Sequence, residues 1–353
     1  PMDALVIYSL AGNREVIDSL RTFKLAEKMD WLAFQKGKKD STLYVRPLNG
    51  KLSTRYEAPA VKAFNFVEKS GMLYYITAGD KAKEKPGLYL LNTETGVKTL
   101  IKEGDGVFKQ VTFDEDGANL AFLYCAQKDS CYKGMSLWLS QQGAPAAEIA
   151  ARGNQAFPKG WVISEHGKLQ FSKSASRLFF GTSPEPRQKD TLQLAENRPN
   201  VQVWSWDEPV QYTVQNYNKE KELKRSYQAV YHINSGRICQ LADEELSQIL
   251  LGDEGDAPLA LLSTSRPYSL SSMWEGRTRS DYYTVSLEDG SRKLLASADY
   301  GRYRLSPQGK YAYWYAETDS CWYTLSMADG KKVQLTTPVS FLAWDEENDV
   351  PDY

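Results

Sequence analysis

The chain has 353 residues, of which 42% are hydrophobic and 12% are aromatic, and it carries a formal net charge of −2. No basic stripe offers a footprint for a phosphate backbone, so we exclude nucleic-acid binding. No apolar run reaches the ~18 residues that a membrane helix needs, so we expect no membrane span. The 22 tyrosines and 9 tryptophans favour strands over helices.

A hairpin pattern recurs along the whole chain. Each copy has an apolar strand, a turn with Gly or Asn, and a second strand that ends in aliphatic residues. Copies at a spacing of roughly 40–50 residues are typical of propeller blades, because a hairpin that cannot bury its own faces must stack on its neighbours. The seven copies begin at Ala4, Thr42, Leu88, Ser136, Tyr227, Tyr282 and Trp322.

Inner hairpins with a second shared pattern lie between these outer hairpins. They begin at Phe23, Phe64, Val111, Leu169 and Tyr303. One inner and one outer hairpin make a four-stranded antiparallel blade. We therefore predict an all-β fold, a single β-propeller domain over residues 1–353, with seven or eight blades in the intact protein.

Both ends of the chain predict an incomplete ring. The hairpin at Ala4 has no inner hairpin before it, and the final FLAWDEENDVPDY starts like the first strand of a blade and then becomes acidic. We expect at least one blade to be cut.

Two long connections interrupt the pattern. The spacing from Ser136 to Tyr227 is about twice the usual one, which predicts an insertion at residues 184–226 within a blade. Residues 209–225 of this insertion favour a short helix. Ser265 to Ser280 form a second long connection between the inner and outer strands of one blade.

Catalytic motifs are missing from the sequence. There is no G-x-S-x-G elbow, no phosphate-binding glycine loop, no C-x-x-C pair, and only two histidines. We therefore predict no catalytic residue, no metal site and no cofactor in this chain. Cys125 and Cys131 flank a turn between strands, where they either form a short disulfide or stay as free thiols. A disulfide would indicate an oxidising compartment.

The first connection carries VWSWDEP, two indoles at i and i+2 followed by two carboxylates. Such a cluster can bind a peptide or its terminal amine. Alternatively, the rings pack the insertion onto its blade and Asp207 caps the following helix. The WEGR segment of the second connection allows the same two interpretations, a functional rim or a structural role. The candidate substrate-binding residues are therefore Trp204, Trp206, Asp207, Glu208, Trp274 and Glu275.

These segments resemble the propeller domain of the prolyl oligopeptidase family of serine peptidases, which includes dipeptidyl and acylaminoacyl peptidases. The resemblance is closest to secreted members from bacteria of the Bacteroidetes type, and it covers most of the chain from about Arg21 onward. It is carried by VQVWSWDEP, YQAVYHINSGRICQLADEE, SRPYSLSSMWEGRTRSDYYTVSLEDGSRKLL and RLSPQGKYAYWYAETDSCWYTLSMADGKKVQLT.

The resemblance implies that this chain is a cap and not a catalyst. In the family a following α/β-hydrolase domain carries the catalytic Ser, Asp and His, so no catalytic residue transfers to this chain. The expected partners are a C-terminal α/β-hydrolase domain of the same polypeptide and peptide substrates, which the propeller filters or positions. The implied location is periplasmic or secreted. The alternative is a stand-alone propeller that serves as a protein-interaction scaffold.

Overall fold

The computed structural model describes residues 3–8, 12, 14–26, 31–37, 41–48, 55–80, 84–127, 131, 134–186 and 201–337. These residues form an all-β structure of six antiparallel sheets, mostly four-stranded, which is the β-propeller blade arrangement predicted from the sequence. The sheets group into two compact units, Pro1–Asn154 and Gln155–Tyr353. The single domain over residues 1–353 stays a prediction.

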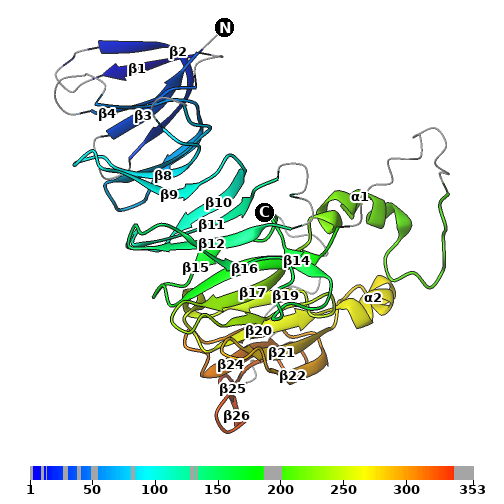
Figure 1. Ribbon diagram of the computed structural model, residues 1–353. Helices are drawn as coiled ribbons and strands as arrows, with labels where there is room; N and C mark the ends of the chain where they lie inside the picture. The colour runs from blue at the N-terminus through cyan, green and yellow to red at the C-terminus, as the bar shows by residue number, and fades with distance from the viewer. Residues whose placement is uncertain are drawn as a thin grey trace. The chain divides into compact units, whose positions relative to one another are not determined.

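The first unit contains three sheets whose strands follow one another in chain order (Figure 1). Glycine and polar turns connect neighbouring strands, as in the Asp114–Gly117 turn, where the Asp114 carboxylate accepts a hydrogen bond from the Asn119 backbone. The strands are β1 (Asp3–Tyr8), β2 (Arg14–Leu25), β3 (Trp31–Lys36), β4 (Leu43–Pro47), β5 (Tyr56–Ala58), β6 (Val61–Phe66), β7 (Met72–Thr77), β8 (Gly87–Asn92), β9 (Lys98–Glu103), β10 (Val107–Phe113), β11 (Asn119–Cys125), β12 (Ser136–Gln141) and β13 (Ala147–Ala150).

The first sheet differs from the expected blade. The hairpin at Ala4 was expected to be the outer half of an incomplete blade of its own. Strand β2 is instead 12 residues long and pairs with β1 on one side and with β3 on the other. Because β2 continues from the first hairpin into the next one, β1 becomes a fifth strand of the same sheet.

Buried apolar side chains hold the sheets of the first unit together. One cluster joins the β1–β5 sheet to the β6–β9 sheet, and in it Leu43 packs with Leu73 and Tyr75. Another joins the β6–β9 sheet to the β10–β13 sheet through Leu88 and Phe122. The sheets are therefore covered on their faces, as stacked blades are.

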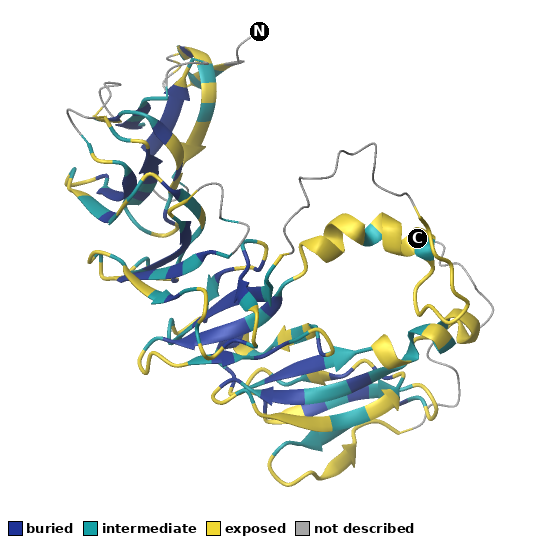
Figure 2. Cartoon of the chain, turned by 45° about the vertical axis from the view of Figure 1, so that its right-hand side comes forward, coloured by how far each residue is buried: buried dark blue, intermediate teal, exposed yellow. Residues whose placement is uncertain are grey.

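The second unit also contains three sheets in chain order. Figure 2 shows that their strands carry most of the buried residues of this unit, whereas the two helices are largely exposed. The strands are β14 (Trp161–Ile163), β15 (Gln170–Phe171), β16 (Arg177–Pro184), β17 (Tyr227–His232), β18 (Ile238–Gln240), β19 (Gln248–Leu251), β20 (Leu259–Thr264), β21 (Ser280–Ser286), β22 (Arg292–Asp299), β23 (Arg304–Leu305), β24 (Tyr311–Ala316), β25 (Cys321–Ser326) and β26 (Lys332–Gln334).

The long insertion lies between two strands of the first sheet of this unit. Strands β16 and β17 are hydrogen-bonded neighbours, with Thr182 opposite Tyr227, and residues 185–226 connect them. We call residues 185–226 the first connection. It contains helix α1 (Tyr212–Leu223), which confirms the predicted helical segment near 209–225.

The second connection, residues 265–279, joins β20 to β21 and is more regular than expected. It contains the 3-10 turn η4 (Arg266–Tyr268) and helix α2 (Ser269–Glu275), and a further 3-10 turn, η3 (Asp253–Gly255), precedes β20. Gly276 ends α2 at φ 67°, in the left-handed region where glycine has no Cβ penalty.

Candidate functional site

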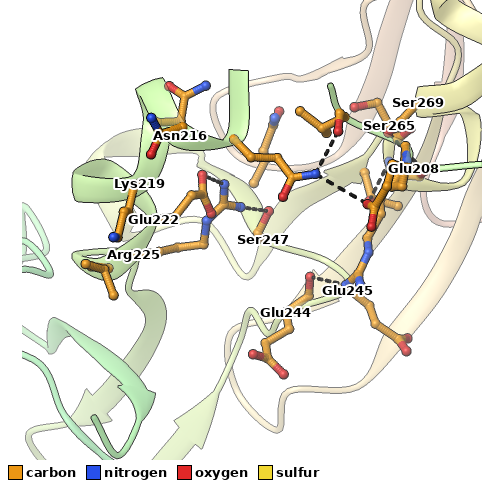
Figure 3. Close-up of a pocket in the computed structure, with 18 of the residues that line it drawn as sticks. Glu208, Asn216, Lys219, Glu222, Arg225, Glu244, Glu245, Ser247, Ser265 and Ser269 are labelled. Atoms are coloured by element: carbon orange, nitrogen blue, oxygen red, sulfur yellow. Dashed lines mark hydrogen bonds and ion pairs between the residues drawn. The ribbon is translucent and has the colours of Figure 1, made fainter. Parts of the chain in front are cut away.

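A pocket of about 940 Å³ lies beside the first connection, and all the residues that line it belong to the second unit (Figure 3). Its walls come from three segments: α1 with the residues just before it, the link between β18 and β19, and the start of the second connection. Segments far apart in the sequence therefore meet at this pocket.

Helix α1 supplies the first wall. Its sequence YTVQNYNKEKEL is rich in residues that favour helix, and none of its residues is buried. Asn216, Lys219 and Glu222 recur at a spacing of three, so they lie along one face of the helix, and all three line the pocket. The helix is held here by its contacts at the two ends and not by a packed apolar face.

The link between β18 and β19 supplies the second wall. The Asp243 carboxylate accepts hydrogen bonds from the backbone N–H groups of Glu245 (2.9 Å) and Leu246 (2.8 Å), while Arg292 donates to its other oxygen. Burial alone would raise the pKa of Asp243, and these hydrogen bonds outweigh it and lower the pKa below its usual value. This turn presents Glu244 and Glu245 to the pocket.

The second connection supplies the third wall. Ser265, Arg266 and Ser269 line the pocket there. The Arg266 guanidinium donates to the backbone carbonyl of Glu244 at 3.4 Å, which ties this wall to the previous one.

Arg225 lies just after the C-terminal end of α1, where the chain returns to the sheet. Its guanidinium forms an ion pair with Glu222 and donates to Ser247 Oγ at 3.4 Å. The hydrogen bond from Arg225 to Glu222 raises the pKa of Arg225, which stays protonated at every working pH. Arg225 thus links the helix to the start of β19.

The charges of the pocket are mixed. Four carboxylates, those of Glu208, Glu222, Glu244 and Glu245, face three cations. The cations are Lys219, Arg225 and Arg266. Groups of both signs around one cavity suit a zwitterionic ligand better than a simple anion or cation.

Of the residues predicted from VWSWDEP, the structure brings Glu208 to the pocket. The Glu208 carboxylate accepts a hydrogen bond from the Gln215 side-chain amide at 3.3 Å. Trp204 contacts the Tyr212 ring at a centroid distance of 5.2 Å, whereas Trp206 is 89% exposed. Trp204 therefore contacts another residue of the insertion while remaining 64% exposed, and Trp206 is presented to solvent.

Asp207 does not cap the helix. Helix α1 begins after Gln211, which makes no side-chain capping bond. The Asp207 carboxylate instead accepts a hydrogen bond from Ser205 Oγ. The capping alternative for Asp207 is wrong, because four residues separate it from the first turn of α1.

Trp274 and Glu275 lie on α2, outside the lining of this pocket. The Glu275 carboxylate accepts hydrogen bonds from Arg279 and from the Tyr300 hydroxyl at 2.9 Å. Trp274 is 86% exposed. The structure thus gives Glu275 a bracing role within the second connection and leaves Trp274 available to a partner.

Sequence reasoning missed the residues that supply most of the charge of the pocket. Arg225, Glu244, Glu245 and Arg266 come from three segments that only the fold brings together. A weak signal existed for Arg225, which ends the predicted helical segment 209–225 and lies two residues before the predicted strand at Tyr227.

Two of the four cysteines are paired, and His232 is buried. Cys125 and Cys131 form a disulfide with their Cα atoms 5.6 Å apart, while Cys239 and Cys321 are buried free thiols. His232 is buried on β17, with Nε2 2.9 Å from the Leu287 carbonyl oxygen. Among the residues that the structure describes, no group of three or more His, Cys, Asp or Glu side chains is placed to hold a metal ion.

Within the described ranges, no helix is both long and apolar enough to cross a membrane.

Comparison with known proteins gives distant structural likenesses. The chain is similar to a prolyl endopeptidase studied for inter-domain dynamics in catalysis and specificity, with 11% identity and a TM-score of 0.39, over 92% of this chain and 44% of that one. It is similar to TolB from Acinetobacter baumannii, with 10% identity and a TM-score of 0.30, over 83% and 59%. It is also similar to the tricorn protease, with 11% identity and a TM-score of 0.36, over 92% and 31%.

The chain spans less than two thirds of each of these proteins. No family model matches the sequence, and no curated protein does. The fold class therefore rests on the sheets of this chain themselves.

Proposed function

We propose that this chain is the β-propeller domain of a serine peptidase of the prolyl oligopeptidase family and contributes no catalytic residue of its own. In this proposal a C-terminal α/β-hydrolase domain of the same polypeptide carries the catalytic residues. The propeller covers that active site, admits extended peptides and excludes packed ones, because an opening a few side chains wide does not pass a folded chain.

One observation carries the proposal. Three of the four segments on which the sequence resemblance rests supply residues to the walls of one pocket. VQVWSWDEP ends at Glu208 and Pro209, YQAVYHINSGRICQLADEE begins at Tyr227 and ends at Glu245, and SRPYSLSSMWEGRTRS begins beside Arg266. Separate segments that share one cavity point to one function for that cavity, and its mixed charges suit peptides.

The disulfide between Cys125 and Cys131 supports a periplasmic or secreted location, since reducing compartments keep such thiols free.

The test compares this chain with the polypeptide extended past Tyr353 to the natural stop codon. Both are assayed on chromogenic dipeptides, with and without a serine-directed phosphonate. We expect hydrolysis by the longer protein alone, blocked by the phosphonate. A stop codon directly after Tyr353, or a longer protein without peptidase activity, would contradict the proposal.

A second candidate function is a stand-alone interaction propeller. The exposed indoles of Trp206 and Trp274 favour it, because large exposed aromatic side chains are typical of binding surfaces. A partner retained by this chain and lost in the Trp206→Ala and Trp274→Ala variants, together with no peptidase activity in the longer protein, would select this alternative.

A further inference from the structure

A second, smaller pocket adjoins the one described above. It has a volume of about 340 Å³, and Ser247 lines both. We call the larger pocket the outer chamber and the smaller one the inner chamber. The first residue before β19 therefore stands at the junction of the two.

Glycine backbone forms one side of the inner chamber. Gly167 and Gly181 face each other so closely that a Cβ on Gly167 would lie 2.3 Å from Gly181 Cα. The two backbones can approach this closely because neither residue carries a side chain. The chamber is also lined by the apolar side chains of Ile249, Leu251 and Phe180.

Some charged side chains of the outer chamber have no charged partner among the described residues. Within the described residues, no ion pair or side-chain hydrogen bond engages the side chains of Lys219, Glu244 and Glu245. Arg266 reaches only a backbone carbonyl, at 3.4 Å. Both a negative and a positive group of a ligand would thus find a counter-charge there.

We propose that the two chambers form one binding site for a short peptide, in which an aliphatic side chain enters the inner chamber past Ser247 while charged groups on either side of it stay in the outer chamber. The inner chamber, at about 340 Å³, has room for an aliphatic side chain, which would contact Phe180, Ile249 and Leu251 there. This proposal deepens the proposed function by naming the class of peptide, but it concerns binding by this chain alone.

The experiment measures peptide binding by calorimetry on this chain, in the absence of any hydrolase domain. The probes are two blocked hexapeptides, GKELKG and GKEGKG, which differ only in the central leucine. We expect the leucine peptide to bind about tenfold more tightly, as the burial of one aliphatic side chain predicts.

Two variants locate the site. Ser247→Trp fills the junction and should reduce the affinity for the leucine peptide to that for the glycine peptide. Ser235→Trp, in the exposed turn between β17 and β18, is the matched control and should leave both affinities unchanged. Far-UV circular dichroism and thermal unfolding verify that both variants fold.

A charge variant keeps the test decisive if the tryptophan at the junction disturbs folding. Glu245→Lys changes an exposed residue and should weaken both peptides severalfold, whereas the control Glu94→Lys, in an exposed turn of the first unit, should weaken neither. Equal affinities for the two probes, no binding at millimolar concentration, or insensitivity to both Ser247→Trp and Glu245→Lys would overturn the proposal.

These outcomes are separable from those of the peptidase test. The chain can bind the leucine peptide even if the longer protein hydrolyses nothing. Conversely, hydrolysis by the longer protein without peptide binding here would leave the proposed function standing and remove the two-chamber site.

Discussion

The two connections that leave the sheets of the second unit are held in opposite ways. Helix α1 of the first connection has no buried residue, and the ion pair at its C-terminal end, between Arg225 and Glu222, is exposed. The second connection is anchored on buried Asp281, whose carboxylate accepts hydrogen bonds from the Tyr268 hydroxyl (2.6 Å), Ser297 Oγ (2.8 Å) and the Ala298 N–H (2.9 Å).

This difference shows which interactions fix the conformation of each connection. Exposed ion pairs contribute about 0–1 kcal/mol, whereas hydrogen bonds to a buried charged group contribute about 1.5–3 kcal/mol each. The second connection is therefore preorganised by the folded sheet, whereas helix α1 of the first connection is held only by weak surface contacts. The four predictions below test this contrast.

The largest effect is expected from Asp281→Ala. Removing this carboxylate leaves three donors without their acceptor, so the free energy of unfolding should fall by about 3 kcal/mol. Urea unfolding followed by tryptophan fluorescence measures the change, with Glu94→Ala as the exposed control. A loss below about 1 kcal/mol would show that the second connection does not depend on this anchor.

The pH dependence of the same anchor follows from its pKa. Burial alone would raise the pKa of Asp281, but the hydrogen bonds from Tyr268, Ala298 and Ser297 outweigh it and hold the pKa below the usual 3.8. A carboxyl with a depressed pKa stabilises the fold at pH values above 3.8 and loses this contribution as the pH falls through its folded pKa. The stability difference between wild type and Asp281→Asn should thus be constant near neutral pH and shrink in acid. A difference that grows in acid would contradict the sign.

A smaller effect is expected for the first connection. Arg225→Ala removes the ion pair with Glu222 and the contact with Ser247, all at the surface, so the free energy of unfolding should fall by less than about 1 kcal/mol. The same urea titration measures it. A loss as large as that of Asp281→Ala would erase the contrast between the two connections.

The smallest effect on stability is expected at the exposed indoles. Trp206→Ala and Trp274→Ala should change the free energy of unfolding by less than about 0.5 kcal/mol, because their rings bury little surface. In the peptidase assay of the longer protein, either variant should lower kcat/KM if the ring contacts substrate. A clear loss of stability would instead assign that ring to packing.

The repeated hairpins allowed the sheets to be predicted, because strand alternation and Gly or Asp turns are local signals. The helix in the insertion was predicted for the same reason, to within three residues at its start and two at its end, α1 spanning Tyr212–Leu223. Helix α2 was not predicted, because this seven-residue helix depends on hydrogen bonds to residues distant in the sequence. The Tyr300 hydroxyl donates to Glu275 at its end, and Tyr268, just before its start, donates to Asp281. Gly276, placed just after it, was the one local signal.

The candidate site was predicted only in part. Glu208 was found because it sits in a dense local cluster with two indoles. Glu245 and Arg266 were not, because neither has an unusual neighbour in the sequence and only the arrangement of sheets brings them to the same pocket. Pairings of this kind are set by the fold and leave no pattern in a single sequence.

The in-register pairing of β16 with β17 has a consequence for how such a protein can diverge. The first connection leaves the sheet after Pro184 and re-enters at Tyr227, directly beside β16. Because the entropy of closing a loop grows slowly with its length, a longer or shorter segment between these points costs the blade little. A segment of another length or sequence could therefore stand between these two points while the sheet that carries it keeps the same pairing.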